Sequence, residues 1–437
     1  MGRVAGLALL VAAGCSASGP PKSATAIAGS TNPGAANSTP AAATTATTPA
    51  TNAPPAATTT TVPLLGAGQE AGSGAIPWSE VGPGWILALW STRGPGATVT
   101  TTTTPAASSD AGLAPTLFLV DPAGGRYRVM SSAELGSGYL AAWSGDGRQA
   151  LLQLSQLTAP GTNDYELLDL SSGSIRPLAL PAGSGRVDFT RPSGQAILDG
   201  AAVTPGTPPS SYGAVGRYDL AGTLQLNYPL SYPGAGTTTG DFLDSPDGTS
   251  LLLTTTVGFE LVGNDGTPIR SIPVPAAAGS CHPTRWWTDT VALASCTNDA
   301  PARLWLVPTD GSVPTALTTS GGTYYADNGD LDAWLLTTGT YVQDVLGCGV
   351  EGVAKLALGA TTTTQLTVPG LDNANSIYVV GADGDRLAVT GSYPCAGGPV
   401  LAWWDTRADS TTLLLGGPVN AGSVDSALLF GQNRSNA

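Results

Sequence analysis

One stretch of the chain, Asp241 to Thr254 (DFLDSPDGTSLLLT), joins two apolar runs through a Ser-Pro-Asp-Gly turn. Short apolar runs around a tight turn predict a β-hairpin, and glycine supplies the positive φ that such turns need. Variants of this stretch recur along the chain, and each is followed by a second candidate hairpin. Two hairpins per repeat make a four-stranded unit, so this repeat constrains the fold more than any other feature.

The repeat predicts seven blades. The inner hairpins are predicted to begin at Trp78, Tyr139, Val187, Asp241, Thr284, Tyr324 and Ile377. Aspartates at or beside the turns of the second hairpins recur about every 45 to 50 residues, at Asp121, Asp169, Asp219, Asp265, Asp310 and Asp405, with a gap in phase at Gly359. A period of this length with four strands is typical of a β-propeller. We therefore predict an all-β, seven-bladed β-propeller of four-stranded antiparallel blades over residues 76–431, followed by a flexible tail, 432–437.

Two further segments belong to the first blade in this prediction. Ser423 to Phe430 (SVDSALLF) is apolar enough to form one more strand. Propellers commonly close by pairing one terminal strand into the blade begun by the other, so we expect this strand to pair with the first blade. An insertion in the same blade, Gly94 to Ala114, is rich in Thr, Ala and Ser and is expected to be a mobile loop.

The first residues have the pattern of an export signal. Arg3 precedes an uninterrupted apolar run, Val4 to Ala13, which is too short to span a bilayer, and Cys15 stands just beyond it. Residues 1–14 resemble a bacterial lipoprotein signal, in which cleavage before the cysteine leaves the Cys15 thiol to be acylated; Ala12 stands where such signals usually carry Leu. The alternative is an ordinary secretory signal in which Cys15 is incidental. We expect the protein at the outer face of the cytoplasmic membrane, or alternatively secreted.

Residues 15–75 are composed mainly of Thr, Ala, Pro, Ser, Gly and Asn with hardly an aromatic. Such a segment buries too little apolar surface to offset the entropy of ordering, so a disordered linker is predicted. The whole chain has a formal net charge of −14, and its lysines are Lys22 and Lys355. Nucleic-acid binding depends on clustered Lys and Arg, so nucleic acid is excluded as an expected partner.

The turn motif carries a family resemblance. The pattern apolar-x-SPDG-x-x-apolar is complete at Ser245 to Gly248 and degenerate at Ser144 to Gly147 and Pro192 to Gly194. It resembles the TolB-like family of bacterial propellers, and Trp404-Asp405 resembles the ending of WD-repeat blades. The resemblance implies a propeller that scaffolds or binds through its faces, and it implies no reaction.

Four cysteines follow Cys15, and export would place them in an oxidising compartment. The repeat alignment places Cys296, Cys348 and Cys395 after the second strand of their blades and Cys281 before the first strand of its own, so all four loops emerge on one face. Of the three possible pairings, we predict Cys281 with Cys296 inside blade five and Cys348 with Cys395 between blades six and seven. A thiolate metal site is the less favoured alternative.

Candidate catalytic residues are scarce. His282 is the one histidine, which excludes sites built from several histidines. A Ser-His-Asp triad could use only His282, and a surface-loop histidine is the favoured interpretation. Asp327, Asp330 and Asp332 lie close together, but their spacing departs from a calcium-binding EF-hand loop, and a solvated hairpin turn explains them. We predict no catalytic residue, no metal and no cofactor.

One stretch stands out as a possible binding face: Cys281 to Trp287 (CHPTRWW), with His282, Arg285, Trp286 and Trp287. Exposed Trp and Arg are typical interface anchors; for the two tryptophans we favour the alternative, packing between blades. The expected function is that of a monomeric, membrane-tethered, non-catalytic module that binds an envelope protein, peptide or glycan. The alternative is an extracellular carbohydrate-active hydrolase or lyase that uses carboxylates in the propeller channel.

Overall fold

The computed structural model describes residues 64–91, 115–133, 135, 138–154, 165–181, 184–201, 213–298, 302–318, 331–345, 351–357, 360, 363–372, 374, 376–393, 397–416 and 422–432. The chain divides into the units Met1–Thr60 and Thr61–Ala437, and every described residue belongs to the second unit. The predicted signal, Cys15 and the insertion from Gly94 to Ala114 lie outside the described residues.

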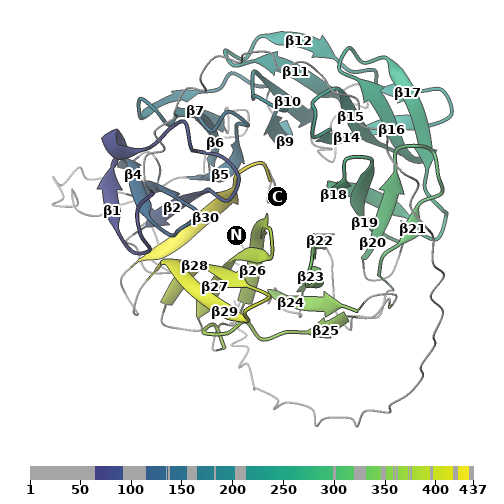
Figure 1. Cartoon of the computed structure of the whole chain (residues 1–437). Helices are drawn as coiled ribbons and strands as arrows, with labels where there is room; N and C mark the ends of the chain where they lie inside the picture. Colours follow the sequence, from purple (N-terminus) through teal and green to yellow (C-terminus); the bar gives the residue numbers. More distant parts are fainter. Residues whose placement is uncertain are drawn as a thin grey trace, which may run out of the picture. The chain divides into compact units, whose positions relative to one another are not determined.

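The second unit is an all-β, seven-bladed propeller, as the repeat predicted. Seven sheets surround a common centre, five of them four-stranded and two five-stranded (Figure 1). Blade one contains β30 (Ser423–Leu429), β2 (Ile86–Ser91), β3 (Thr116–Val120), β4 (Arg126–Ser131) and β1 (Glu70–Gly72), and a short 3₁₀ helix, η1 (Ser73–Ala75), follows β1. Blade two contains β5 (Gly138–Trp143), β6 (Gln149–Leu154), β7 (Tyr165–Asp169) and β8 (Ser174–Pro177). Blade three contains β9 (Ser184–Phe189), β10 (Ala196–Ala201), β11 (Val215–Asp219) and β12 (Leu224–Asn227).

The remaining blades repeat this order. Blade four contains β13 (Ser231–Tyr232), β14 (Gly236–Asp244), β15 (Ser250–Thr255), β16 (Gly258–Gly263) and β17 (Pro268–Pro273). Blade five contains β18 (Ser280–Thr288), β19 (Val291–Thr297), β20 (Arg303–Pro308) and β21 (Thr315–Ala316). Blade six contains β22 (Asp332–Leu336), β23 (Gly339–Val345), β24 (Glu351–Leu356) and β25 (Thr363–Gln365). Blade seven contains β26 (Ser376–Asp383), β27 (Arg386–Tyr393), β28 (Gly397–Asp405) and β29 (Ser410–Leu415).

Blade one closes the ring through the predicted strand. β30 pairs antiparallel with β2, with Leu429 opposite Ile86. The hairpin predicted at Trp78 was wrong, because only its second half forms a strand and β30 takes the inner position. β30 pairs with β2 from Ile86 to Ser91, so it occupies the edge of β2 that the first half of the predicted hairpin would have used.

Blade one also begins earlier than the predicted start of the propeller at residue 76. The described chain starts at Leu64, and β1 pairs in parallel with the outer strand β4. Leu65 packs against the apolar core of this blade, and its N–H donates to the Tyr127 hydroxyl at 3.4 Å. The sequence analysis assigned residues 64–75 to the linker on composition. A segment that is held by a few contacts can have the same composition as a disordered one.

Blade six differs from the prediction in the position of its inner hairpin. The turn was expected near Asn328 and Gly329, but the inner hairpin is formed by β22 and β23 with its turn at Thr337 and Thr338. The apolar run before that turn is therefore the first strand of the blade, not the second. As a consequence, Asp332 is fully buried and does not belong to a solvated turn.

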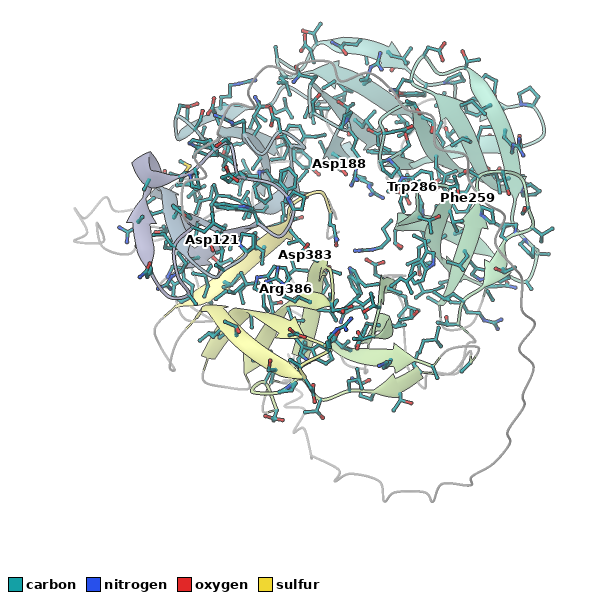
Figure 2. All side chains as sticks on the ribbon, in the orientation of Figure 1. Asp121, Asp188, Phe259, Trp286, Asp383 and Arg386 are labelled. Carbon is teal, nitrogen blue, oxygen red and sulfur yellow. A yellow bond between two sulfur atoms is a disulfide. The ribbon has the colours of Figure 1, made fainter. Side chains whose placement is uncertain are left out.

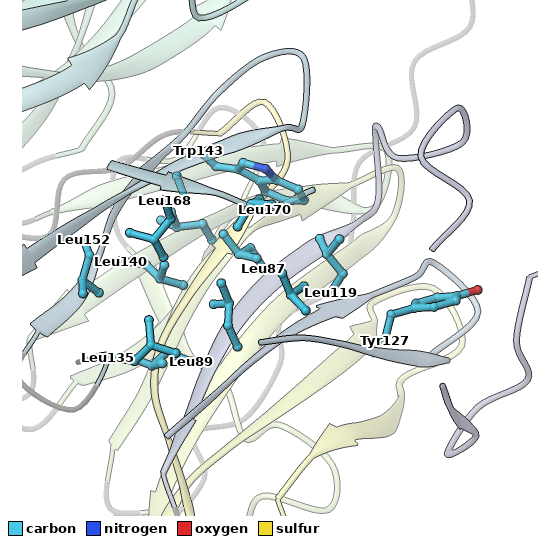
Figure 3. Packing of buried hydrophobic residues seen from close by; sticks show 14 of the residues in the cluster. Leu87, Leu89, Leu119, Tyr127, Leu135, Leu140, Trp143, Leu152, Leu168 and Leu170 are labelled. Carbon is cyan, nitrogen blue, oxygen red and sulfur yellow. The ribbon is translucent and has the colours of Figure 1, made fainter. Parts of the chain in front are cut away.

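The core lies between neighbouring blades. Between blades one and two, Leu87 and Leu89 of β2 pack in one cluster with Leu140 and Trp143 of β5 (Figure 3). Each blade is too thin to bury its own faces, so stacking of neighbouring blades supplies the hydrophobic stabilisation. Among the described residues, no helix has the length and apolar character that crossing a membrane requires.

Candidate functional site

The innermost strands of the blades surround the propeller axis. β30, β5, β9, β14, β18, β22 and β26 contact one another in that order and close a ring. Polar side chains from these strands and from the segment after β30 are joined by hydrogen bonds and ion pairs across the blades. We call six of them the axial site: Arg186, Asp241, His282, Arg285, Asp332 and Gln432.

Arg186 of β9 links three blades. Its Nη1 lies 3.3 Å from Asp241 Oδ1 on β14 and donates to the Pro283 carbonyl on β18 at 3.2 Å. The guanidinium carbon lies 5.3 Å from the centre of the Phe242 ring, within range of a cation–π interaction. The Arg186 side chain is 13% exposed, so its charge is held largely out of solvent by these partners.

His282 lies within the inner strand β18, whereas a surface loop was predicted, and it is the accessible member of the axial site. Its Nδ1 lies 3.1 Å from Asp241 Oδ2, and its side chain is 54% exposed. Ser295 lies opposite His282 across the β18–β19 hairpin but is fully buried. A buried hydroxyl cannot meet a substrate, so these residues do not form a working nucleophile and base.

Arg285 and Asp332 form a two-point ion pair between blades five and six. Arg285 Nε donates to Asp332 Oδ1 at 2.8 Å and to Oδ2 at 2.9 Å, and Nη2 lies 2.7 Å from Oδ2. The guanidinium also lies 4.5 Å from the centre of the Trp334 ring. Charge-assisted pairs with this geometry are strong and fix the direction of the arginine side chain.

Gln432 joins this pair from the segment that follows β30. Its Oε1 accepts hydrogen bonds from Arg285 Nη1 at 3.2 Å and from the Ala382 N–H at 3.0 Å, and its Nε2 donates to the Ala382 carbonyl at 2.5 Å. Blades five and one are not neighbours in the ring, so the contact with Arg285 crosses the axis. The sequence analysis predicted that Gln432 begins a flexible tail. In the structure its side chain makes three hydrogen bonds, to Arg285 and to both backbone groups of Ala382.

Asp188 and Asp244 bring two carboxyl groups together between blades three and four. Asp188 is 8% exposed and Asp244 is 6% exposed. The pKa of Asp244 is raised to about 7, chiefly by burial and in smaller part by the charge of Asp188, while the Arg191 N–H, which donates to Asp244 Oδ2 at 2.6 Å, lowers it. Figure 2 labels Asp188 and Trp286 on the inner side of the ring.

The two tryptophans of the predicted binding face pack between blades. Trp286 lies against the apolar cluster of blades four and five, and its Nε1 donates to the Asp244 carbonyl at 2.6 Å. Trp287 lies against the cluster between blades five and six. Of the four residues in the predicted face, His282 and Arg285 therefore belong to the axial site. Their partners from other blades were missed, although a charged residue in an apolar inner strand, as at Asp332, was an available signal.

The cysteines lie on blades five to seven. Cys281 and Cys296 are joined by a disulfide and stand opposite each other within β18 and β19, rather than in the loops where they were expected. Cys348 and Cys395, and likewise Asp327 and Asp330, fall outside the described residues, so their predicted roles remain predictions. Within the described ranges, no three His, Cys, Asp or Glu side chains gather closely enough to hold a metal ion.

Comparison with known proteins gives remote structural likeness. No protein-family model matches the sequence, and no curated protein matches it. Among solved structures, a prolyl endopeptidase has a TM-score of 0.45 at 13% identity, with 69% of this chain and 46% of that chain covered. A puromycin-hydrolysing peptidase of Mycobacterium tuberculosis has a TM-score of 0.43 at 16% identity, covering 69% of this chain and 50% of that chain. TolB from Acinetobacter baumannii has a TM-score of 0.38 at 16% identity, with 78% of this chain and 66% of that chain covered. The chain spans about half the length of the two peptidases.

Proposed function

We propose that this protein is a non-catalytic propeller that binds a protein, peptide or glycan of the cell envelope at its axial site. The observation that carries the proposal is the pairing of the axial charges. Arg186 and Arg285 are each fixed against a carboxylate of the next blade, while His282 remains exposed beside Asp241. Polar groups that are already oriented lose little freedom when a ligand binds, which favours recognition.

We further propose that the propeller is tethered at the outer face of the cytoplasmic membrane. The apolar run ahead of Cys15 and the Thr-rich segment after it support this proposal. Fatty-acid labelling tests the anchor: label on the wild type that is lost in Cys15→Ala supports acylation. Equal label on both proteins, or none on either, contradicts it.

Site-specific photo-crosslinking in intact cells tests the binding function. A photoreactive residue is placed at His282, in the axial site, and in a matched control at Val313, which is 73% exposed in the turn between β20 and β21. We expect a covalent adduct of defined mass from position 282 and none from position 313. The same adduct from both positions, or no adduct from position 282, contradicts the proposal.

Asp188 and Asp244 favour a second candidate, a carbohydrate-active hydrolase. Glycosidases use one carboxyl group with a raised pKa and a second carboxylate, and burial gives Asp244 the first property. Both side chains are more than nine-tenths buried, which weighs against access by a polysaccharide. The test measures the release of reducing ends from envelope glycans. Release by the wild type that is lost in Asp244→Asn would establish the enzyme. Equal release by both proteins, or no release by either, would contradict it.

A further inference from the structure

Gln432 occupies a polar site that has the features of a receptor for a primary carboxamide. The N–H and the carbonyl of Ala382 point to the same side of β26, and they contact Gln432 Oε1 and Nε2. The guanidinium of Arg285 supplies a second donor to Oε1. A primary amide complements this set fully, because its oxygen accepts and its NH₂ group donates.

The surroundings of the site discriminate against related groups. A carboxylate has no hydrogen to donate to the Ala382 carbonyl and would place an anion against that oxygen. Asp332 already neutralises the charge of Arg285, so little net positive charge remains to attract an acid. The trans amide of an N-acetyl sugar carries its N–H and carbonyl on opposite sides, so it cannot reach both groups of Ala382.

Gly381 leaves the space that the amide occupies. A Cβ at this position would lie 2.5 Å from Gln432 Oε1 and 2.9 Å from Leu429 Cδ2. The backbone of Gly381 is not in the positive-φ region, so the need for glycine here is one of space rather than of conformation. Arg285 of β18 and Ala382 of β26 bind the Gln432 amide, and Gly381 of β26 and Leu429 at the end of β30 bound the space beside it.

We propose that this is a binding site for the Gln or Asn side chain of a partner peptide, and that the chain's own Gln432 fills it until the peptide displaces it. The proposal rests on the binding function proposed above and names the ligand class. Gln432 acts as an intramolecular competitor, so its removal increases affinity for the peptide. A substitution in a merely structural residue would not do so.

Calorimetric titration of the full chain with three peptides tests the proposal. The probes are the tripeptides Ala-Gln-Ala, Ala-Glu-Ala and Ala-Ala-Ala, each with an acetylated N-terminus and a C-terminal N-methylamide, so that the glutamine side chain carries the only primary carboxamide among them. We expect Gln432→Ala to bind Ala-Gln-Ala at least about tenfold more tightly than the wild type does, and to bind the Glu and Ala peptides at least about tenfold more weakly than the Gln peptide. Adding Gly381→Ala to Gln432→Ala places a methyl group in the amide position and is expected to abolish binding.

A second variant guards against loss of folding. Gln432→Glu keeps the size of the side chain but lacks the donor to Ala382, so it too is expected to release the site to Ala-Gln-Ala. Equal affinity of the wild type and both folded variants for the Gln peptide, equal affinity for all three peptides, or no binding overturns the inference. N-acetylglucosamine competing as well as the Gln peptide overturns it in favour of a glycan. The two proposals can fail separately. If position 282 gives a covalent adduct in cells but the peptides do not bind, the carboxamide site is contradicted and the proposed binding function still stands.

Discussion

Arg285 of blade five and Asp332 of blade six hold each other through two atoms of each side chain, with Asp332 fully buried and the Arg285 side chain 15% exposed. The pair joins blades that share no strand pairing. It also orients the guanidinium that meets Gln432 from across the axis. One ion pair thus serves both the ring and the candidate ligand site.

Arg285→Met is expected to destabilise the fold by about 3–5 kcal/mol, because it leaves the Asp332 carboxylate buried without its cation. Asp332→Leu in the same protein should recover part of that loss, since the uncompensated charge is then absent. Denaturant unfolding of both variants gives the two values. Arg128→Ala is the control: this arginine is 56% exposed and paired with Glu70, so only a small change is expected. Equal effects of Arg285→Met and Arg128→Ala would contradict the role assigned to the buried pair.

The free energy of unfolding is expected to depend on pH because the pKa of Asp244 differs between the folded and the unfolded state. With a folded pKa near 7 and an ordinary value near 3.8, the native state holds a proton that the unfolded state releases. Stability therefore falls as the pH rises from about 4 to about 7, by on the order of 3 kcal/mol, and Asp244→Asn removes that fall. Urea unfolding across this range measures the slope.

Asp247 in the next turn is the matched control for that pH series. The Ser245 hydroxyl and the Thr249 N–H lower the pKa of its carboxyl group, so its contribution is present near neutral pH and is lost as the pH falls through the folded pKa. Asp247→Asn should therefore cost stability at pH 7 and little at pH 3. The same pH slope in both variants would show that Asp244 does not carry the effect.

The Cys281–Cys296 disulfide should stabilise the propeller. The bond closes a loop of 15 residues, which corresponds to about 3 kcal/mol. The variant with serine at both positions is expected to unfold at lower denaturant concentration than the wild type, and the gap should disappear when the wild type is reduced. A non-reducing peptide map tests the predicted partner bond: Cys348 joined to Cys281 would contradict both pairings.

The closing strand should be essential to the ring. Leu428 of β30 is 3% exposed in the core between blades one and two, so Leu428→Ala should cost roughly 2–5 kcal/mol. Leu413 of the outer strand β29 is 51% exposed, and Leu413→Ala should change stability little. Thermal unfolding of the pair compares them directly. Similar melting temperatures for the two variants would mean that closure through β30 adds little.

The blades could be predicted from sequence because each hairpin is a local pattern of apolar runs and a turn. Blade six was placed out of register because the acidic run DNGDLD has the composition of a turn, and the partner that makes Asp332 a core residue lies 47 residues earlier in the chain. The axial site shows the same limit. His282 and Arg285 stood out in one short stretch, whereas Asp241, Asp332 and Gln432 come from other blades and meet them only when the ring closes.

The most direct test of the axial site measures the affinity of the crosslinked partner, once it is identified, for the wild type and for Asp241→Asn. This substitution removes the carboxylate that faces Arg186 and His282 and leaves the Arg285–Asp332 pair intact. We predict at least about a tenfold loss of affinity with unchanged circular dichroism, as expected when charged hydrogen-bonding partners are lost from a binding site. Unchanged affinity in a folded Asp241→Asn protein would contradict binding at the axis.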